Sequence, residues 1–170
     1  GWGFSDDYHD WTAGLVRDGR GDLYVGLGSD YSQKGRAADN DRWRGTVLRL
    51  ERGGRIEPFA FSMRFPMGLA VDNQDRLFAT DNQGVQNTWN ELNHIQRGRH
   101  YGVPSRHDTA EGVPSESPAL MIPHPWTRSV NAVAFFPADY PRSSLAGQGV
   151  ACEYDTQCLI RFSLQEVDGV

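Results

Sequence analysis

The stretch from residue 81 to residue 101 holds the residue types best suited to chemistry. Carboxylate and amide side chains follow one another closely there: Asp81, Asn82, Gln83, Asn87, Asn90, Glu91 and Asn93. Hard cations such as Ca²⁺ bind about six to eight oxygens of this kind. We expect a long loop that ends at Gly102, with Glu91 as its strongest ligand. Composition leaves two interpretations open, a cation or cofactor site and a hydrogen-bonded Asx-rich loop without an ion.

Arg64 is a second candidate, because it stands between the apolar segments 61–63 and 65–67. Burying a guanidinium near apolar residues is unfavourable unless it faces an anion. Arg64 could therefore clamp a carboxylate or a developing oxyanion near the axis of the fold. An ion pair with a neighbouring carboxylate is the simpler alternative.

His9 is a third candidate, because Asp6, Asp7 and Asp10 lie close to it in the chain. Neighbouring carboxylates favour protonation of a histidine, so its neutral ring could accept a proton as a general base. The alternative is a polar surface side chain. The remaining histidines show no zinc-binding spacing, and we assign them no metal: His94, His100, His107 and His124.

A repeat of 54 residues indicates which elements position these side chains. Glycine, leucine, aspartate and an aromatic residue recur at matching offsets: Gly14/Gly68, Leu15/Leu69, Asp18/Asp72, Leu23/Leu77 and Tyr24/Phe78. Each copy reads as an apolar strand, a polar turn and a second apolar strand, which is the signature of a β-hairpin. Two more strands are expected around 53–54, and a divergent third copy over 131–155.

About four strands in each period of this length are typical of β-propeller blades. No window of the sequence carries a helical apolar period, and Gly or Pro interrupts nearly every stretch. The sequence therefore predicts an all-β fold, a β-propeller of which about three blades are present. Closed propellers need at least ~4 blades. We therefore expect residues 1–170 to form one partial propeller domain, truncated at both ends and six-bladed in the full protein.

Composition excludes some classes of protein. Apolar residues make up 38%, charged residues 23%, and the net charge is −5. This balance indicates a soluble globular protein and argues against a general nucleic-acid binder. No apolar run approaches the length of a membrane span. A hairpin turn at 155–156 would put Cys152 opposite Leu159 and Cys158 on the other face, so no disulfide is expected between the two cysteines.

Several motifs occur in a specific order: GDLY at 21–24, RGTVLRL at 44–50, MRFPMGLA at 63–70, NELNHI at 90–95 and GxxYGxP at 98–104. With them the chain resembles the soluble quinoprotein glucose and aldose sugar dehydrogenases, six-bladed propellers that use pyrroloquinoline quinone (PQQ) and Ca²⁺. Three further motifs, at 81–84, 125–131 and 159–169, are similar to large secreted bacterial proteins. Those proteins commonly join such a propeller to a cytochrome c domain.

The resemblance implies a role for each matching residue. Arg64 matches the arginine that contacts the quinone, and the main-chain carbonyls of Gly84 and Val85 would hold the cofactor's Ca²⁺. Glu91 and Tyr101 match positions around a structural Ca²⁺.

Three more residues complete this candidate site. Asn90, beside Glu91, belongs to the same candidate metal set. His9 lies near the place of the general base that removes the sugar hydroxyl proton as hydride passes to the quinone. Arg161 resembles a late arginine that faces the cofactor.

The implied function is PQQ-dependent, Ca²⁺-assisted oxidation of a sugar or other alcohol, in a periplasmic or secreted bacterial protein with cytochrome c as a possible electron acceptor. Two departures qualify it. Phe65 and Met67 replace an Asn and Gln pair of the family, and the loop from Gly84 to Glu91 is one residue longer. The alternatives are a non-catalytic propeller that binds carbohydrate or protein partners, and a lactonase-like Ca²⁺ hydrolase.

Overall fold

The protein is described by a computed structural model over residues 10–29, 43–82, 88–103 and 113–167. These residues contain eleven strands and no helix. The first sheet has the order β1 (Thr12–Arg17), β2 (Leu23–Leu27), β3 (Thr46–Leu50), β4 (Ile56–Ala60). The second has the order β5 (Pro66–Val71), β6 (Leu77–Asp81), β7 (Trp89–Ile95), β8 (Leu120–Pro123). The third joins β9 (Val130–Phe135), β10 (Gly149–Glu153) and β11 (Leu159–Phe162).

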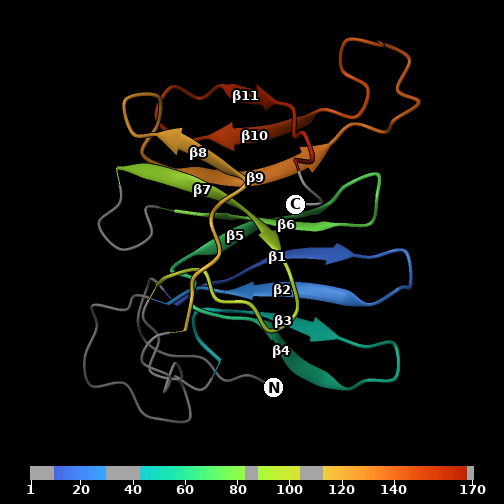
Figure 1. Ribbon diagram of the computed structural model, residues 1–170, viewed down its shortest axis with the longest axis vertical. Helices are drawn as coiled ribbons and strands as arrows, with labels where there is room; N and C mark the ends of the chain where they lie inside the picture. The colour runs from blue at the N-terminus through green and yellow to red at the C-terminus, as the bar shows by residue number, and fades with distance from the viewer. Residues whose placement is uncertain (1–9, 30–42, 83–87, 104–112, 168–170) are drawn as a thin grey trace.

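The three sheets follow one another along the long axis of the molecule (Figure 1). All strand pairs within them are antiparallel, and β5 packs against both β1 and β9. The first strands of the three sheets therefore lie side by side, as the innermost strands of adjacent propeller blades do. The all-β prediction is confirmed, and so are the hairpins expected from the repeat and around residues 53–54.

The repeated glycines allow neighbouring sheets to approach. A Cβ on Gly14 would lie 2.8 Å from the carbonyl oxygen of Met67, and one on Gly68 would lie 2.5 Å from that of Asn131. Each glycine thus lets the first strand of its sheet contact the first strand of the next. This packing explains why glycine recurs at this point of the repeat.

The repeated aspartates close the outer turns of the two hairpins. Asp18 Oδ1 accepts the N–H groups of Arg20 and Asp22, at 3.0 and 2.9 Å. Asp72 Oδ1 accepts those of Gln74 and Arg76, both at 2.9 Å. These are Asx turns, so this part of the repeat is structural.

Two apolar clusters join the sheets. The cluster between the first and second sheets includes Tyr24, Val47, Met63, Ala79 and Ile95, all buried. The cluster between the second and third sheets is equally buried and includes Phe78, Leu92, Ile122, Val133 and Phe162. Each large apolar side chain here contributes about 1.5–3 kcal/mol by leaving water, so the two interfaces hold the blades in place.

The expected long loop from 81 to 101 is wrong, because residues 89–95 form β7, a strand inside the second sheet. Leu92 and Ile95 pack into the two apolar clusters. The polar residues of β7, Asn90, Glu91 and Asn93, gave the segment a loop-like composition. They are tolerated in a buried strand because other polar groups meet them there, as described below.

Candidate functional site

One end of the second sheet gathers the main site candidates. β5 begins at Pro66, β6 ends at Asp81 and β7 begins at Trp89. Because these strands are antiparallel, the residue before β5, the last residue of β6 and the start of β7 all lie at the same end of the sheet. Arg64 therefore lies beside the polar stretch that begins at Asp81.

Arg64 is half-buried and anchored through both its backbone and its side chain. Its N–H donates to Asp81 Oδ2 at 2.9 Å, and its carbonyl oxygen accepts the N–H of Ser29 at 2.7 Å. Its guanidinium Nη1 donates to the carbonyl oxygen of Asn82 at 3.1 Å. The N–H of Phe65 donates to Asp81 Oδ1 at 2.6 Å. These bonds fix the position of the arginine at the end of the sheet where β5 begins and β6 ends.

Asp81 and Glu91 are directly opposite each other in the β6–β7 ladder, and both are buried. Burial raises the pKa of Asp81 to about 7, although the N–H groups of Phe65 and Arg64 lower it. The charge of Glu91 adds to the rise. Glu91 also accepts the side-chain N–H of Asn93 at 3.2 Å. Two buried carboxyl-bearing residues are therefore paired across the ladder, and their surroundings favour the protonated form of Asp81.

A chain of polar side chains continues from this point to the third sheet. Asn82 Nδ2 donates to Ser129 Oγ at 3.0 Å, and Ser129 Oγ donates to Asn131 Oδ1 at 2.9 Å. The buried Oδ1 of Asn82 has no hydrogen-bond partner among the described residues. It is therefore an available acceptor beside the Arg64 guanidinium.

The structure separates the metal candidates. Asn90 and Glu91 are adjacent in β7, so their side chains point to opposite faces. Asn90 Nδ2 donates to the carbonyl oxygen of Thr127 at 3.0 Å, toward the third sheet. The two side chains therefore do not reach one ion together. The part of the chain that the structure describes contains no group of three or more His, Cys, Asp or Glu residues suited to a metal.

The Tyr101 hydroxyl forms two hydrogen bonds with the backbone of neighbouring residues. It donates to the carbonyl oxygen of His94 at 2.6 Å and accepts the N–H of Gln96 at 2.9 Å. Burial raises the pKa of Tyr101 to about 12. Its main-chain N–H bonds to the carbonyl oxygen of Phe61 at 3.1 Å, beside the segment that leads to Arg64. Any metal contact from Tyr101 would come from its carbonyl, as the resemblance implies.

Arg161 lies apart from these residues. It belongs to β11, is exposed, and is separated from β9 by β10. Three other candidates, His9, Gly84 and Val85, lie outside the described residues. Next to His9, Asp10 is buried and its carboxylate lies 3.9 Å from the guanidinium Nε of the buried Arg44.

An aromatic pair beside Arg64 was missed by the sequence analysis. The rings of Trp11 and Phe65 have centroids 5.6 Å apart and planes inclined at 52°. Trp11 is 52% exposed. The two residues are 54 positions apart, so the repeat was a signal that could have paired them. The pair places an apolar surface next to the arginine.

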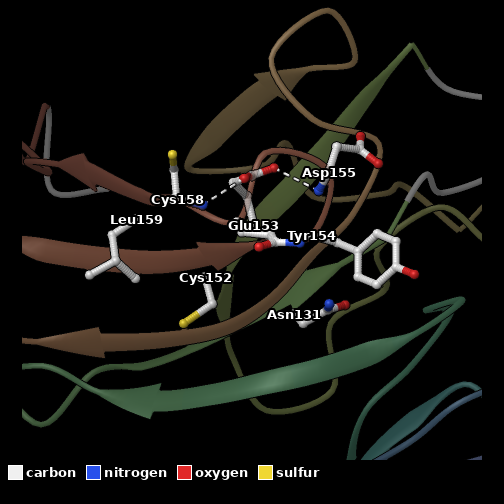
Figure 2. Close-up of a pocket in the computed structure, with 8 residues that line it drawn as sticks. Asn131, Cys152, Glu153, Tyr154, Asp155, Cys158 and Leu159 are labelled. Carbon is white, nitrogen blue, oxygen red and sulfur yellow. Dashed lines mark hydrogen bonds between the residues drawn. The ribbon is translucent and has the colours of Figure 1, made fainter.

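A pocket on the third sheet lies elsewhere and involves neither Arg64 nor Glu91 (Figure 2). It is lined by Asn131, Cys152, Glu153, Tyr154, Asp155, Gln157, Cys158 and Leu159. The predicted pairing of Cys152 with Leu159 is confirmed. The thiols of Cys152 and Cys158 point in opposite directions and are both free, as expected.

The comparison with protein families decides the classification of the chain. A family model described as Glucose / Sorbosone dehydrogenase matches residues 5–117. The chain belongs to this family. The match covers the first sheet, the strands β5, β6 and β7 of the second sheet, and the residues Arg64, Asp81 and Glu91. Within the glucose/sorbosone dehydrogenase family, the first two sheets are therefore two successive blades. A comparison with curated proteins gives no match.

Solved structures support the fold of this family member. The PQQ-bound form of aldose sugar dehydrogenase from Streptomyces coelicolor is 23% identical with a TM-score of 0.67, over 91% of this chain and 46% of that one. The apo-form of the soluble aldose sugar dehydrogenase from Escherichia coli is 21% identical with a TM-score of 0.65, over 89% and 50%. A candidate glucose dehydrogenase from Thermus thermophilus is 24% identical with a TM-score of 0.68, over 99% and 52%. The chain thus spans about half the length of these proteins and has the fold of a partial propeller.

Proposed function

We propose that this chain contributes the Arg64 side of the active site of a PQQ-dependent dehydrogenase that oxidises a sugar or another alcohol. The carrying observation is the anchored Arg64, with its guanidinium 3.1 Å from the carbonyl oxygen of Asn82 at the end of the second blade. Family membership over residues 5–117 and the PQQ-bound structural relative support the cofactor.

The residues around Arg64 fit an anionic quinone. A half-buried guanidinium attracts carboxylates, and the free Oδ1 of Asn82 can accept a hydrogen bond or contact a cation. When bound, PQQ supplies a quinone carbonyl that accepts hydride. In this proposal Arg64 orients the cofactor, and His9 takes the proton from the substrate hydroxyl.

We further propose Ca²⁺ at two places. The carbonyls of Gly84 and Val85, which follow Asn82 in the chain, would hold the ion that accompanies the quinone. Glu91 would bind a structural ion, for which the buried Asp81–Glu91 pair is the support, because a divalent cation offsets two facing carboxylates. Asn90 and Tyr101 would take part through main-chain carbonyls.

The aromatic pair bears on the substrate. Trp11 and Phe65 offer an apolar surface next to Arg64, where Phe65 and Met67 replace two amides of the family pattern. A surface of this kind packs against the C–H face of a sugar ring or against a less polar alcohol. We propose that binding of the substrate depends less on hydrogen bonds to side-chain amides than it would with the family's amide pair.

The proposal has three further parts. Arg161 would face the cofactor, cytochrome c would accept the electrons, and the protein would be periplasmic or secreted. The support for Arg161 is the resemblance, because its side chain is exposed on β11, at the edge of the third sheet. The described residues contain no helix long and apolar enough to cross a bilayer.

A non-catalytic propeller is the second candidate, and one observation favours it. The amide pair of the family is absent at Phe65 and Met67, which removes hydrogen bonds to cofactor or sugar. Such a protein would bind carbohydrate or protein partners on the same fold.

Activity after reconstitution separates the two. The protein is incubated with PQQ and Ca²⁺ and supplied with aldoses and simple alcohols, and reduction of an artificial electron-accepting dye is followed. Substrate-dependent reduction that requires PQQ supports the dehydrogenase. Bound PQQ without turnover of any substrate class, or no bound PQQ, favours the binding protein.

A further inference from the structure

We propose that Asp81 is the positioning residue of the Arg64 site, fixing the 64–65 peptides so that the guanidinium is presented to the cofactor. The identity of that cofactor as PQQ rests on the proposed function. The anchoring itself rests on hydrogen bonds within the described residues.

Each carboxylate oxygen of Asp81 accepts one backbone N–H group. Oδ2 accepts the N–H of Arg64 at 2.9 Å, and Oδ1 accepts the N–H of Phe65 at 2.6 Å. Both bonds end on a carboxylate that is completely buried. These two N–H groups favour the ionised form of Asp81 and oppose the effect of burial, which raises its pKa to about 7.

A side chain is needed here because the strand ladder does not fix this segment. Pro66, opposite Asp81 in the register, has no N–H to donate, and the register shifts between Pro66 and Leu69. The backbone just before β5 would otherwise have no regular partner in β6. Asp81 supplies the two missing acceptors at the point where the ladder fails.

The same end of β6 also holds the side chain of the arginine. The carbonyl oxygen of Asn82, the next residue, accepts the Arg64 guanidinium at 3.1 Å. The backbone of Arg64 is therefore hydrogen-bonded to residue 81 and its guanidinium to residue 82. Because Asp81 is fully buried and its oxygens accept the N–H groups of residues 64 and 65, it acts on the quinone through Arg64.

The same hairpin provides a matched control at its opposite end. Asp72 accepts two backbone N–H groups, from Gln74 and Arg76, both at 2.9 Å. It also pairs with the Arg76 guanidinium, at 2.6 Å. Asp72→Asn therefore perturbs two carboxylate–backbone bonds in the turn of the same hairpin, away from Arg64.

A double-mutant cycle with PQQ as the probe tests the positioning role. Asp81→Asn leaves one acceptor and turns an N–H₂ group toward a donor, so PQQ affinity is expected to fall about tenfold. Asp72→Asn leaves PQQ affinity unchanged. In the Arg64→Ala background, Asp81→Asn causes no further loss, because its effect passes through the arginine. Unchanged affinity in Asp81→Asn, or an equal loss with and without Arg64, overturns the proposal.

Amide hydrogen exchange tests the anchoring without any cofactor. In the unsubstituted protein, the amides of Arg64 and Phe65 are expected to exchange as slowly as those inside β6. Asp81→Asn accelerates these two amides, whereas Asp72→Asn accelerates only those of Gln74 and Arg76. Fast exchange at Arg64 and Phe65 in the unsubstituted protein overturns the proposal even if Asp81→Asn does not fold. Failure of the unsubstituted protein to bind PQQ, with slow exchange at these amides, overturns the proposed function and leaves the anchoring supported.

Discussion

Asp81 and Glu91 face each other across the β6–β7 ladder, with both carboxyl groups buried in the sheet interface. Burial and the charge of Glu91 both raise the pKa of Asp81, so a proton, a donor or a cation must compensate the pair. Backbone N–H groups compensate Asp81 in part. The pair is therefore important for two proposals, the binding of Ca²⁺ by Glu91 and the positioning of Arg64 by Asp81.

Ca²⁺ is expected to raise the thermal midpoint of the protein through Glu91. A ligand that binds only the folded state stabilises it by about 2.7 kcal/mol at one hundred times its dissociation constant. Glu91→Gln removes the charged ligand, so the Ca²⁺-induced rise disappears. Thermal unfolding with Ca²⁺ and with a chelator measures this difference. An equal rise in the variant would place the ion elsewhere.

Gly68→Ala is expected to destabilise the fold by about 1–3 kcal/mol, since overpacked sites lose stability on that scale. The added Cβ would lie 2.5 Å from the carbonyl oxygen of Asn131, so the second and third sheets must separate. Gly53→Ala is the control, because nothing lies within 4 Å of its added Cβ. Denaturant unfolding compares the two variants. Equal stabilities would show that the close approach at Gly68 is relaxed at no cost.

Glu153 is expected to make stability fall in acid. Its carboxylate accepts the Thr156 hydroxyl and the N–H groups of Thr156 and Cys158. These bonds lower its pKa from 4.5 to about 2, with the Thr156 hydroxyl contributing most. Because the folded pKa is depressed, the stabilisation is fully present above about pH 4.5 and is lost as pH falls toward 2.

Unfolding in urea at pH 2 to 6 measures that dependence. Glu153→Gln is expected to flatten the curve in this window. Glu166→Gln, at a carboxylate whose side chain is 53% exposed, keeps the slope of the unsubstituted protein. The same acid slope in Glu153→Gln would assign the effect to other carboxylates.

Phe65→Asn is expected to shift substrate preference toward more hydroxylated sugars. The substitution restores an amide next to Arg64 and removes the ring that packs at 5.6 Å from Trp11. The ratio of kcat/KM for an aldose to that for a simple alcohol rises several-fold. Trp126→Ala, at a tryptophan that is 65% exposed and outside this pair, leaves the ratio unchanged. An unchanged ratio in Phe65→Asn would exclude this ring from substrate recognition.

The sequence was sufficient to predict the blades. Gly14 and Gly68 mark sheet contacts, and Asp18 and Asp72 mark hairpin turns, so the repeat reflects local and packing constraints that each blade must satisfy. The position of Arg64 just before β5 also followed from its place ahead of an apolar strand.

The polar interior of β7 could not be predicted in the same way. Asn90, Glu91 and Asn93 resemble loop residues in composition, and only the partners from neighbouring strands make them acceptable in a buried strand. Strand alternation sends the side chains of Asn90 and Glu91 to opposite faces, which the composition of the segment does not reveal. Asp81 had no sequence signal for its role, which depends on Pro66 lacking an N–H across the ladder.

A titration of PQQ, with and without Ca²⁺, tests the central proposal most directly. Bound stoichiometry and absorbance are followed for the unsubstituted protein, for Arg64→Ala and for Arg55→Ala, whose side chain is 70% exposed on an outer strand connection. The proposed function predicts one PQQ bound per chain in the presence of Ca²⁺, with affinity reduced at least about tenfold in Arg64→Ala and unchanged in Arg55→Ala. No uptake by the unsubstituted protein, or equal uptake by Arg64→Ala, would contradict it.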